Sequence, residues 1–188
     1  MTPIIGIIAS STSGASALGN FESISTQTLG SSQATITFSS IPSTYTHLQL
    51  RIISRSTNTS FQQIGFSMRF NGDTAANYSA HQLYGDRSVA GASAPGVSAT
   101  SMLLGQESSS INNPSNLSFG ATIIDILDYT NTNKYKTVRS LTGSDITTAG
   151  TIALRSGNWR STSAVTSITF FETSSFTANS SFALYGIK

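Results

Sequence analysis

Short stretches that alternate apolar and polar residues recur from about residue 20 onward, and segments rich in Ser, Asn, Gly and Thr separate them. In residues 34–38 (ATITF) and 168–170 (ITF) every second side chain is apolar, which is the period of a strand with one face against a core. Helical periodicity is weak throughout the chain. The pattern predicts ten strands, at residues 22–29, 34–38, 47–55, 64–70, 101–104, 119–128, 135–142, 151–155, 164–171 and 181–187.

About ten strands in about 165 residues, joined by polar loops, are typical of an antiparallel sandwich or barrel. This number of strands favours two packed sheets over a small barrel. We therefore expect an all-β protein built as an antiparallel two-sheet jelly-roll-like sandwich. Residues 21–188 would form this β-domain, and residues 1–20 would form an extended N-terminal arm.

Three segments lack the strand pattern. Residues 74–83 (TAANYSAHQL) offer the best helical alternative, as one short turn of helix. Residues 88–100 are rich in small side chains, and residues 108–116 read SSSINNPSN. Both compositions predict loops.

Two turns follow from residue types that tolerate positive φ. The sequence NGD at residues 71–73 predicts a tight reversal after the strand before it, and DYTNTNKY at 128–135 predicts a hairpin. The hairpin would place oppositely charged residues across from one another. The residues concerned are Asp125, Asp128, Lys136 and Arg139.

Charge and cysteine content exclude several classes of function. Only 10% of the 188 residues are charged, the formal net charge is +2, and the basic residues are scattered singly, so we expect no nucleic-acid partner. The absence of cysteine excludes disulfides, thiolate zinc sites and a cysteine nucleophile. No window approaches 18 consecutive apolar residues, so we expect no membrane span.

The chain opens with an apolar burst, MTPIIGIIASS. No basic residue follows Met1 and the apolar run is short, so we do not expect a cleaved signal peptide, although Ala15-Ser16-Ala17 is like a cleavage site. An extended conformation would present apolar side chains on both faces and would need a covering surface to become ordered. We expect a docking arm that adds to a sheet edge through Pro3, Ile4, Ile5, Ile7 and Ile8.

Groups suited to catalysis or metal binding are few. The chain has three Glu, five Asp and two His, and it lacks the G-x-S-x-G sequence of a nucleophile elbow. Asp125 and Asp128 are close in sequence, but an offset of three places them on opposite faces of a strand. His47 reads as a half-exposed strand residue. We therefore expect no enzyme, no catalytic residue, no cofactor and no metal site.

Trp159 leaves two alternatives open. With its neighbours Asn158 and Arg160 and the tyrosines Tyr78 and Tyr129, it could stack on a sugar ring or on an extended polymer. A lone Trp is also usually well buried, and Trp159 would then cap one end of the core.

Four stretches carry a resemblance to a known family. They are FSSIPSTYTHLQLRIISRS (38–56), SMRFNGDTAANYSAHQLYGD (67–86), TIIDILDYTNTNKYKTVRSLTG (122–143) and SSFALYGIK (180–188), and the opening MTPIIGIIASS is similar as well. Together they resemble small β-rich virion or tail-fibre proteins of tailed bacteriophages, especially phages of cyanobacteria and other aquatic bacteria. The resemblance covers nearly the whole chain and brings no assigned catalytic residue.

The resemblance implies a jelly-roll-like module on the virion, assembled in the host cytoplasm and trimeric by analogy. We expect a non-enzymatic structural protein, a capsid decoration or cement protein docked to other virion proteins through its arm. The alternative is the receptor-binding head of a tail or head fibre, which would recognise a host surface glycan.

Overall fold

The computed structural model describes residues 20–61, 63–108, 117–146 and 149–188. These residues form two antiparallel sheets that pack face to face, and they contain no helix. The all-β sandwich predicted from the sequence is therefore confirmed. The docking residues predicted in the arm lie outside the described residues; they are Pro3, Ile4, Ile5, Ile7 and Ile8.

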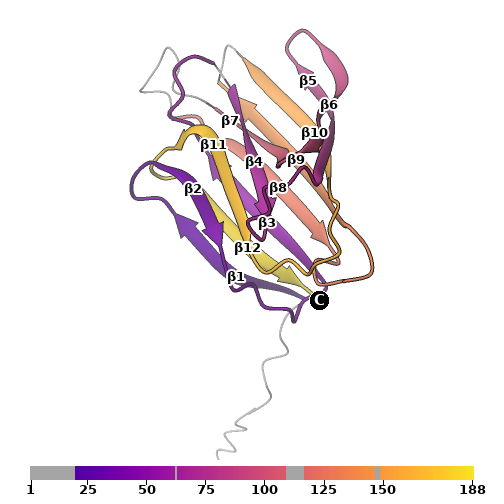
Figure 1. The fold of residues 1–188 in the computed structure, drawn as a ribbon. Helices are drawn as coiled ribbons and strands as arrows, with labels where there is room; N and C mark the ends of the chain where they lie inside the picture. The colour runs from indigo at the N-terminus through magenta and orange to yellow at the C-terminus, as the bar shows by residue number, and fades with distance from the viewer. Residues whose placement is uncertain (1–19, 62, 109–116, 147–148) are drawn as a thin grey trace, which may run out of the picture.

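The larger sheet has eight strands, and the first and last strands in the sequence pair at one of its edges (Figure 1). At that edge the backbone N–H of Lys188 donates to the carbonyl of Asn20 at 3.1 Å. In spatial order the strands are β1 (Phe21–Thr28), β12 (Ser181–Ile187), β3 (His47–Ser54), β8 (Gly120–Leu127), β9 (Lys136–Asp145), β10 (Gly150–Trp159), β5 (Tyr78–Asp86) and β6 (Ala90–Ala99).

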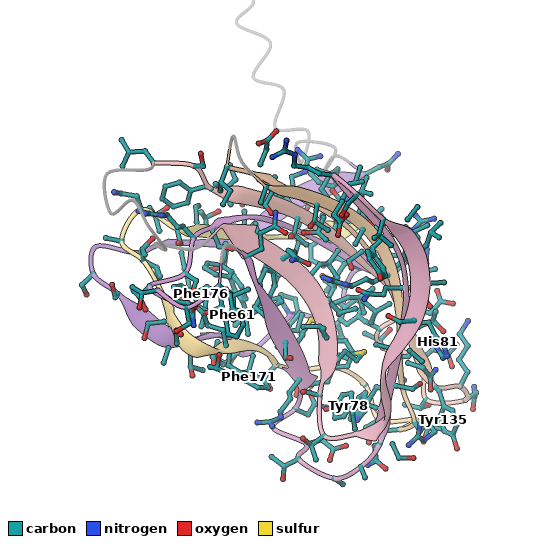
Figure 2. The ribbon with its side chains drawn as sticks, turned by 90° about the horizontal axis from the view of Figure 1, so that it is seen from above. Phe61, Tyr78, His81, Tyr135, Phe171 and Phe176 are labelled. Carbon is teal, nitrogen blue, oxygen red and sulfur yellow. The ribbon has the colours of Figure 1, made fainter. Side chains whose placement is uncertain are left out.

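The smaller sheet has four strands and covers one face of the larger sheet, with side chains filling the space between the two layers (Figure 2). Its strands come from distant parts of the sequence. In spatial order they are β2 (Gln33–Phe38), β11 (Ile168–Phe176), β4 (Gln63–Phe70) and β7 (Met102–Ser108).

An aromatic cluster at the centre of the core joins the two sheets. Phe66 lies edge-on to Phe170 and Phe176, with ring centroids 6.0 and 5.8 Å apart. Phe176 also lies edge-on to Phe182 of the larger sheet at 4.9 Å. Around this cluster the alternating strands bury aliphatic side chains, which include Leu48, Leu50, Ile52, Ile124, Ile126, Val138 and Leu184.

All ten strands predicted from the alternation are present, with ends that differ by a few residues. The short helix considered for residues 74–83 is wrong, because the chain from Tyr78 onward is strand β5 and pairs with β10. The residues just before it form a turn, in which the Ala75 N–H donates to Asp73 Oδ1 at 2.8 Å and the Asn77 N–H to the Ala75 carbonyl at 2.7 Å. The turn and the strand that directly follows it together gave a spacing of apolar residues that resembled that of a helix.

The loop predicted for residues 88–100 is also wrong, because most of it is strand β6. This strand lies at an edge of the larger sheet and pairs only with β5. Exposed small side chains such as Ala92 and Ser93 need no apolar alternation, so the strand carries little sequence signal. Of the loop predicted for 108–116, residues 109–116 lie outside the described part of the chain.

Both predicted turns are confirmed. Asn71 and Gly72 have φ of 51° and 68°, and the Asp73 N–H donates to the Phe70 carbonyl at 2.9 Å. This reversal leads from β4 in the smaller sheet to β5 in the larger one, so it joins the two layers. Residues 128–135 connect the paired strands β8 and β9 as a hairpin.

Of the predicted cross-strand charge pairs, only the one that involves Arg139 is present. Arg139 Nη2 lies 2.9 Å from Asp125 Oδ2 across the hairpin. Asp128 pairs with Lys134 instead of Lys136. Lys136 shares its strand face with buried residues of β9, so it is fully buried and donates to the backbone carbonyls of Asn131, Lys134 and Thr162.

Candidate functional site

The cluster predicted to stack on a glycan is part of the core. Trp159 is 2% exposed and Tyr78 and Tyr129 are 0% exposed, so none of them offers a ring face to a ligand. Trp159 packs between Phe70 and Tyr78, with centroid distances of 5.4 and 6.3 Å. The glycan platform is therefore wrong for these three rings, and the alternative that Trp159 caps the core holds.

Hydrogen bonds around Trp159 stabilise this end of the sandwich. Its indole Nε1–H donates to Asp73 Oδ2 at 2.7 Å, and Asn77 Nδ2 donates to the same oxygen at 3.0 Å. The hydrogen bond from Asn77 and then that from Trp159 hold the pKa of Asp73 below its ordinary value. Tyr78 accepts the Phe70 N–H at 3.1 Å and donates to the Asp73 carbonyl at 3.1 Å.

The flanking residues Asn158 and Arg160 are half-buried and serve the same end of the fold. Arg160 Nη2 donates to the Ala76 carbonyl at 2.6 Å. Asn158 Nδ2 lies 3.5 Å from the Lys136 carbonyl, at the limit of a hydrogen bond. Both side chains thus contact neighbouring backbone carbonyls and have a structural role.

A second polar group lies between the sheets, around Arg155. Arg155 is 4% exposed, and its guanidinium donates to Gln82 Oε1, the Gly105 carbonyl and Gln106 Oε1 at 2.8, 2.7 and 2.9 Å. Burial lowers the pKa of Arg155 to about 10. Nearby, Ser140 Oγ donates to the Leu104 carbonyl at 2.6 Å. These bonds connect β10 and β9 to β7, so this group holds the two layers together.

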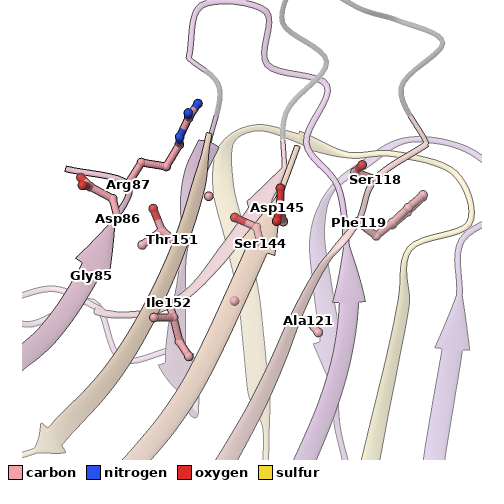
Figure 3. Close-up of a pocket in the computed structure, with 12 residues that line it drawn as sticks. Gly85, Asp86, Arg87, Ser118, Phe119, Ala121, Ser144, Asp145, Thr151 and Ile152 are labelled. Atoms are coloured by element: carbon pink, nitrogen blue, oxygen red, sulfur yellow. The ribbon is translucent and has the colours of Figure 1, made fainter. Parts of the chain in front are cut away.

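An open cleft of about 660 Å³ lies at one end of the larger sheet. Figure 3 shows Asp86 and Arg87 on one side of it, Ser118 and Phe119 on the opposite side, and Asp145 between them. Asp86 accepts the N–H groups of Ser88 and Val89 at 2.8 and 2.7 Å, and these bonds lower its pKa. The cleft combines carboxylates, hydroxyls, a guanidinium and a phenyl ring.

The outer face of the larger sheet carries a row of exposed aliphatic side chains. Ile123 pairs with Leu141, Leu141 with Leu154, and Leu154 with Leu83, so the row crosses four adjacent strands. The four side chains are 44%, 51%, 47% and 61% exposed, in that order. We call them the aliphatic stripe. Further exposed apolar residues flank it on the same sheet, namely Ile53, Leu127 and Ile152.

The sequence analysis missed this stripe, although a signal was present. In residues 120–127 (GATIIDIL) the inward side chains include Ile124 and Ile126, while Ile123 and Leu127 occupy the outward positions. Apolar residues at both the odd and the even positions of a strand indicate that both of its faces are apolar. Contiguous apolar surface of this kind marks interaction sites on soluble proteins.

Asp128 lies next to both His47 and Lys134. His47 is half-exposed, as predicted, and its Nδ1 accepts the Asp128 N–H at 2.9 Å. Among the described residues no three His, Asp or Glu side chains gather to hold a metal ion. In the same part of the chain, no helix is long and apolar enough to cross a membrane.

The geometry thus offers two surfaces for recognition, the aliphatic stripe and the cleft. Both lie on the larger sheet and outside the core. Comparisons with protein-family models, curated proteins and solved structures found no match for this chain.

Proposed function

We propose that this protein is a non-enzymatic structural component of a tailed-phage virion, a capsid decoration or cement protein. The observation that carries the proposal is the aliphatic stripe, a contiguous apolar surface on a β-sandwich that is otherwise rich in hydroxyl groups. Such a surface is costly in a protein that works alone in water, and it is useful in one that assembles. The resemblance to phage virion proteins supports the same role.

The strand order supports a jelly-roll description of the fold. Leaving aside the pairs β5–β6 and β9–β10, the two sheets read β1-β12-β3-β8 and β2-β11-β4-β7. In that arrangement most successive strands alternate between the sheets, as in the two interlocked Greek keys of a jelly roll. We infer a jelly roll whose larger sheet is extended at the β8 edge by two inserted strand pairs, a fold that many capsid proteins share.

In this proposal the chain attaches to the major capsid protein or to fibre proteins through its apolar arm, at Pro3, Ile4, Ile5, Ile7 and Ile8. Its location is the virion, and assembly takes place in the host cytoplasm. The β-domain stands on the particle as a homotrimer, by analogy with phage decoration and fibre-head proteins.

Incorporation into particles tests the proposal. Particles would be assembled with the full chain, with a chain lacking residues 2–13, and with Leu154→Glu, and the bound protein would be located by electron microscopy. We expect the full chain on the shell, and both altered chains to be lost from it. Ser156→Glu is the matched control, because Ser156 is exposed two residues along the same strand and face. Retention of both altered chains, or density only at the tail tip, would contradict the capsid role.

The cleft supports a second candidate function, recognition of a host glycan by a fibre head. Its carboxylates, hydroxyls and phenyl ring are the groups that bind and orient a polar ligand in a concave site. A glycan array with the isolated protein tests this function. Arg87→Ala should weaken binding about tenfold or more, whereas Arg139→Ala, outside the cleft, should not. Absence of binding to host envelope polysaccharides would count against it.

A further inference from the structure

The outer face of the larger sheet connects the exit point of the N-terminal arm to the aliphatic stripe. Phe21, the first residue of β1, is 41% exposed and stacks on Tyr185 with ring centroids 4.7 Å apart. The guanidinium of Arg51 lies over both rings, at 5.0 and 5.4 Å. Arg51 in turn pairs with Ile123, the first residue of the stripe. Outward side chains therefore lead from the arm to the stripe without a break.

The chain before Phe21 is long enough to reach the stripe. Strands lie about 4.8 Å apart and rise about 3.3 Å per residue, which places Ile123 about 20 Å and Leu154 about 27 Å from Phe21. The linker from Ser10 to Asn20 spans up to about 36 Å when extended. Residues 3–9 add about 23 Å, more than the width of the stripe.

The chemistry of the two partners also matches. Residues 1–20 contain no charged side chain, and residues 3–9 contain four isoleucines. The four side chains of the stripe are aliphatic and uncharged. A linker whose length suits the span gives an effective concentration in the millimolar range, so at micromolar protein the arm of the same chain outcompetes that of another copy.

We infer that residues 3–9 of the arm lie across the aliphatic stripe of their own eight-stranded sheet. Because side chains of an extended segment alternate, Ile4 and Ile8 share one face of the arm, and Ile5 and Ile7 share the other. One pair then covers the sheet, and the other pair faces outward. The outward pair would contact the virion partner, and only this last step rests on the proposed function.

Cross-linking of the isolated full chain tests the inference without any particle. The protein has no cysteine, so two introduced cysteines are the only thiols. The test pair is Ile8→Cys with Leu141→Cys, treated with a short bis-maleimide. The control pair is Ile8→Cys with Thr35→Cys, an exposed position on β2, the strand that follows β1. A third chain adds Leu83→Glu and Leu154→Glu to the test pair.

We expect an intramolecular product in the test pair, formed about tenfold faster than in the control pair, since docking raises the local concentration of the two thiols. The glutamates should reduce this rate to that of the control. Equal rates in the test and control pairs would overturn the inference. A covalent dimer as the main product would also overturn it, because the stripe would then be covered by a second copy. Incorporation into particles is measured in a separate assay, so failure of this inference and failure of the proposed function can be told apart.

Discussion

Replacing Arg155 by Ala tests the role assigned to the buried polar group between the sheets. The side chain is almost fully buried and supplies three hydrogen bonds to neutral oxygens on β5 and β7. The substitution leaves the buried carbonyl of Gly105 without this donor. The amides of Gln82 and Gln106 are only half-buried, so water can replace the guanidinium there.

An orphaned buried acceptor costs about 1–3 kcal/mol, and the loss of a packed arginine stem adds to it. Removal of a buried cation returns part of this cost, because its desolvation is relieved. We therefore expect Arg155→Ala to lower the free energy of unfolding by about 2–4 kcal/mol.

Urea unfolding followed by tryptophan fluorescence measures this change. The chain has one Trp, and Trp159 is buried on the same strand as Arg155, so its emission reports loss of the core. Arg139→Ala is the matched control. Arg139 is on the adjacent strand, its side chain is 67% exposed, and its ion pair with Asp125 should contribute less than about 1 kcal/mol. If the two variants unfold at the same urea concentration, the structural role of Arg155 is refuted.

Three further predictions concern stability. Burial raises the pKa of Tyr78 to about 12, so the phenol of the unfolded chain loses its proton at a lower pH than that of the folded chain. The free energy of unfolding should therefore fall between pH 10 and 12. Urea titrations should show a smaller fall in Tyr78→Phe. The pKa of Asp73 is lowered by its hydrogen bonds to Asn77 and Trp159, so its contribution should be lost as pH falls below about 4. Asp73→Asn should flatten that acid limb, and an unchanged limb would contradict this. Gly105→Ala would place a Cβ on the Phe66 ring and should cost about 1–3 kcal/mol in thermal or urea unfolding, whereas Gly30→Ala, with open space around it, should cost less than about 0.5 kcal/mol.

The fold class followed from the sequence because inward positions such as Leu48, Leu50 and Ile52 are apolar and the residues between them are mostly not. Strand β6 could not be predicted in this way. It is an edge strand of small exposed side chains, and backbone pairing with β5 rather than core packing keeps it in place. Sheet order also could not be predicted, since pairing between distant strands leaves no local pattern.

The burial of Lys136 was not predicted from the sequence, in which this residue was expected to form a cross-strand charge pair. Arg155 lies on the same strand face as Ala153 and Trp159, and Lys136 lies on the same face as Val138. The alternation along each strand alone would therefore place both bases in the interior. Arginine and lysine are rarely buried, so position on the strand alone is a weak indication that either base is in the interior. Both side chains are accommodated because backbone carbonyls and amide oxygens accept their hydrogen bonds. The same alternation would have identified the aliphatic stripe, because its apolar residues occupy the outward positions of their strands.

The positions of β11 and β12 constrain when the protein can fold. Strand β11 lies between β2 and β4 in the smaller sheet, and β12 lies between β1 and β3 in the larger one. Neither sheet is complete until residues 168–187 have left the ribosome, so each of the strands β1 to β4 keeps at least one unpaired edge until then. Long-range pairing of this kind is slow and exposes aggregation-prone strands. We expect both sheets to be completed only after β11 and β12 have emerged, and expression at low temperature or with chaperones to improve the yield of native protein.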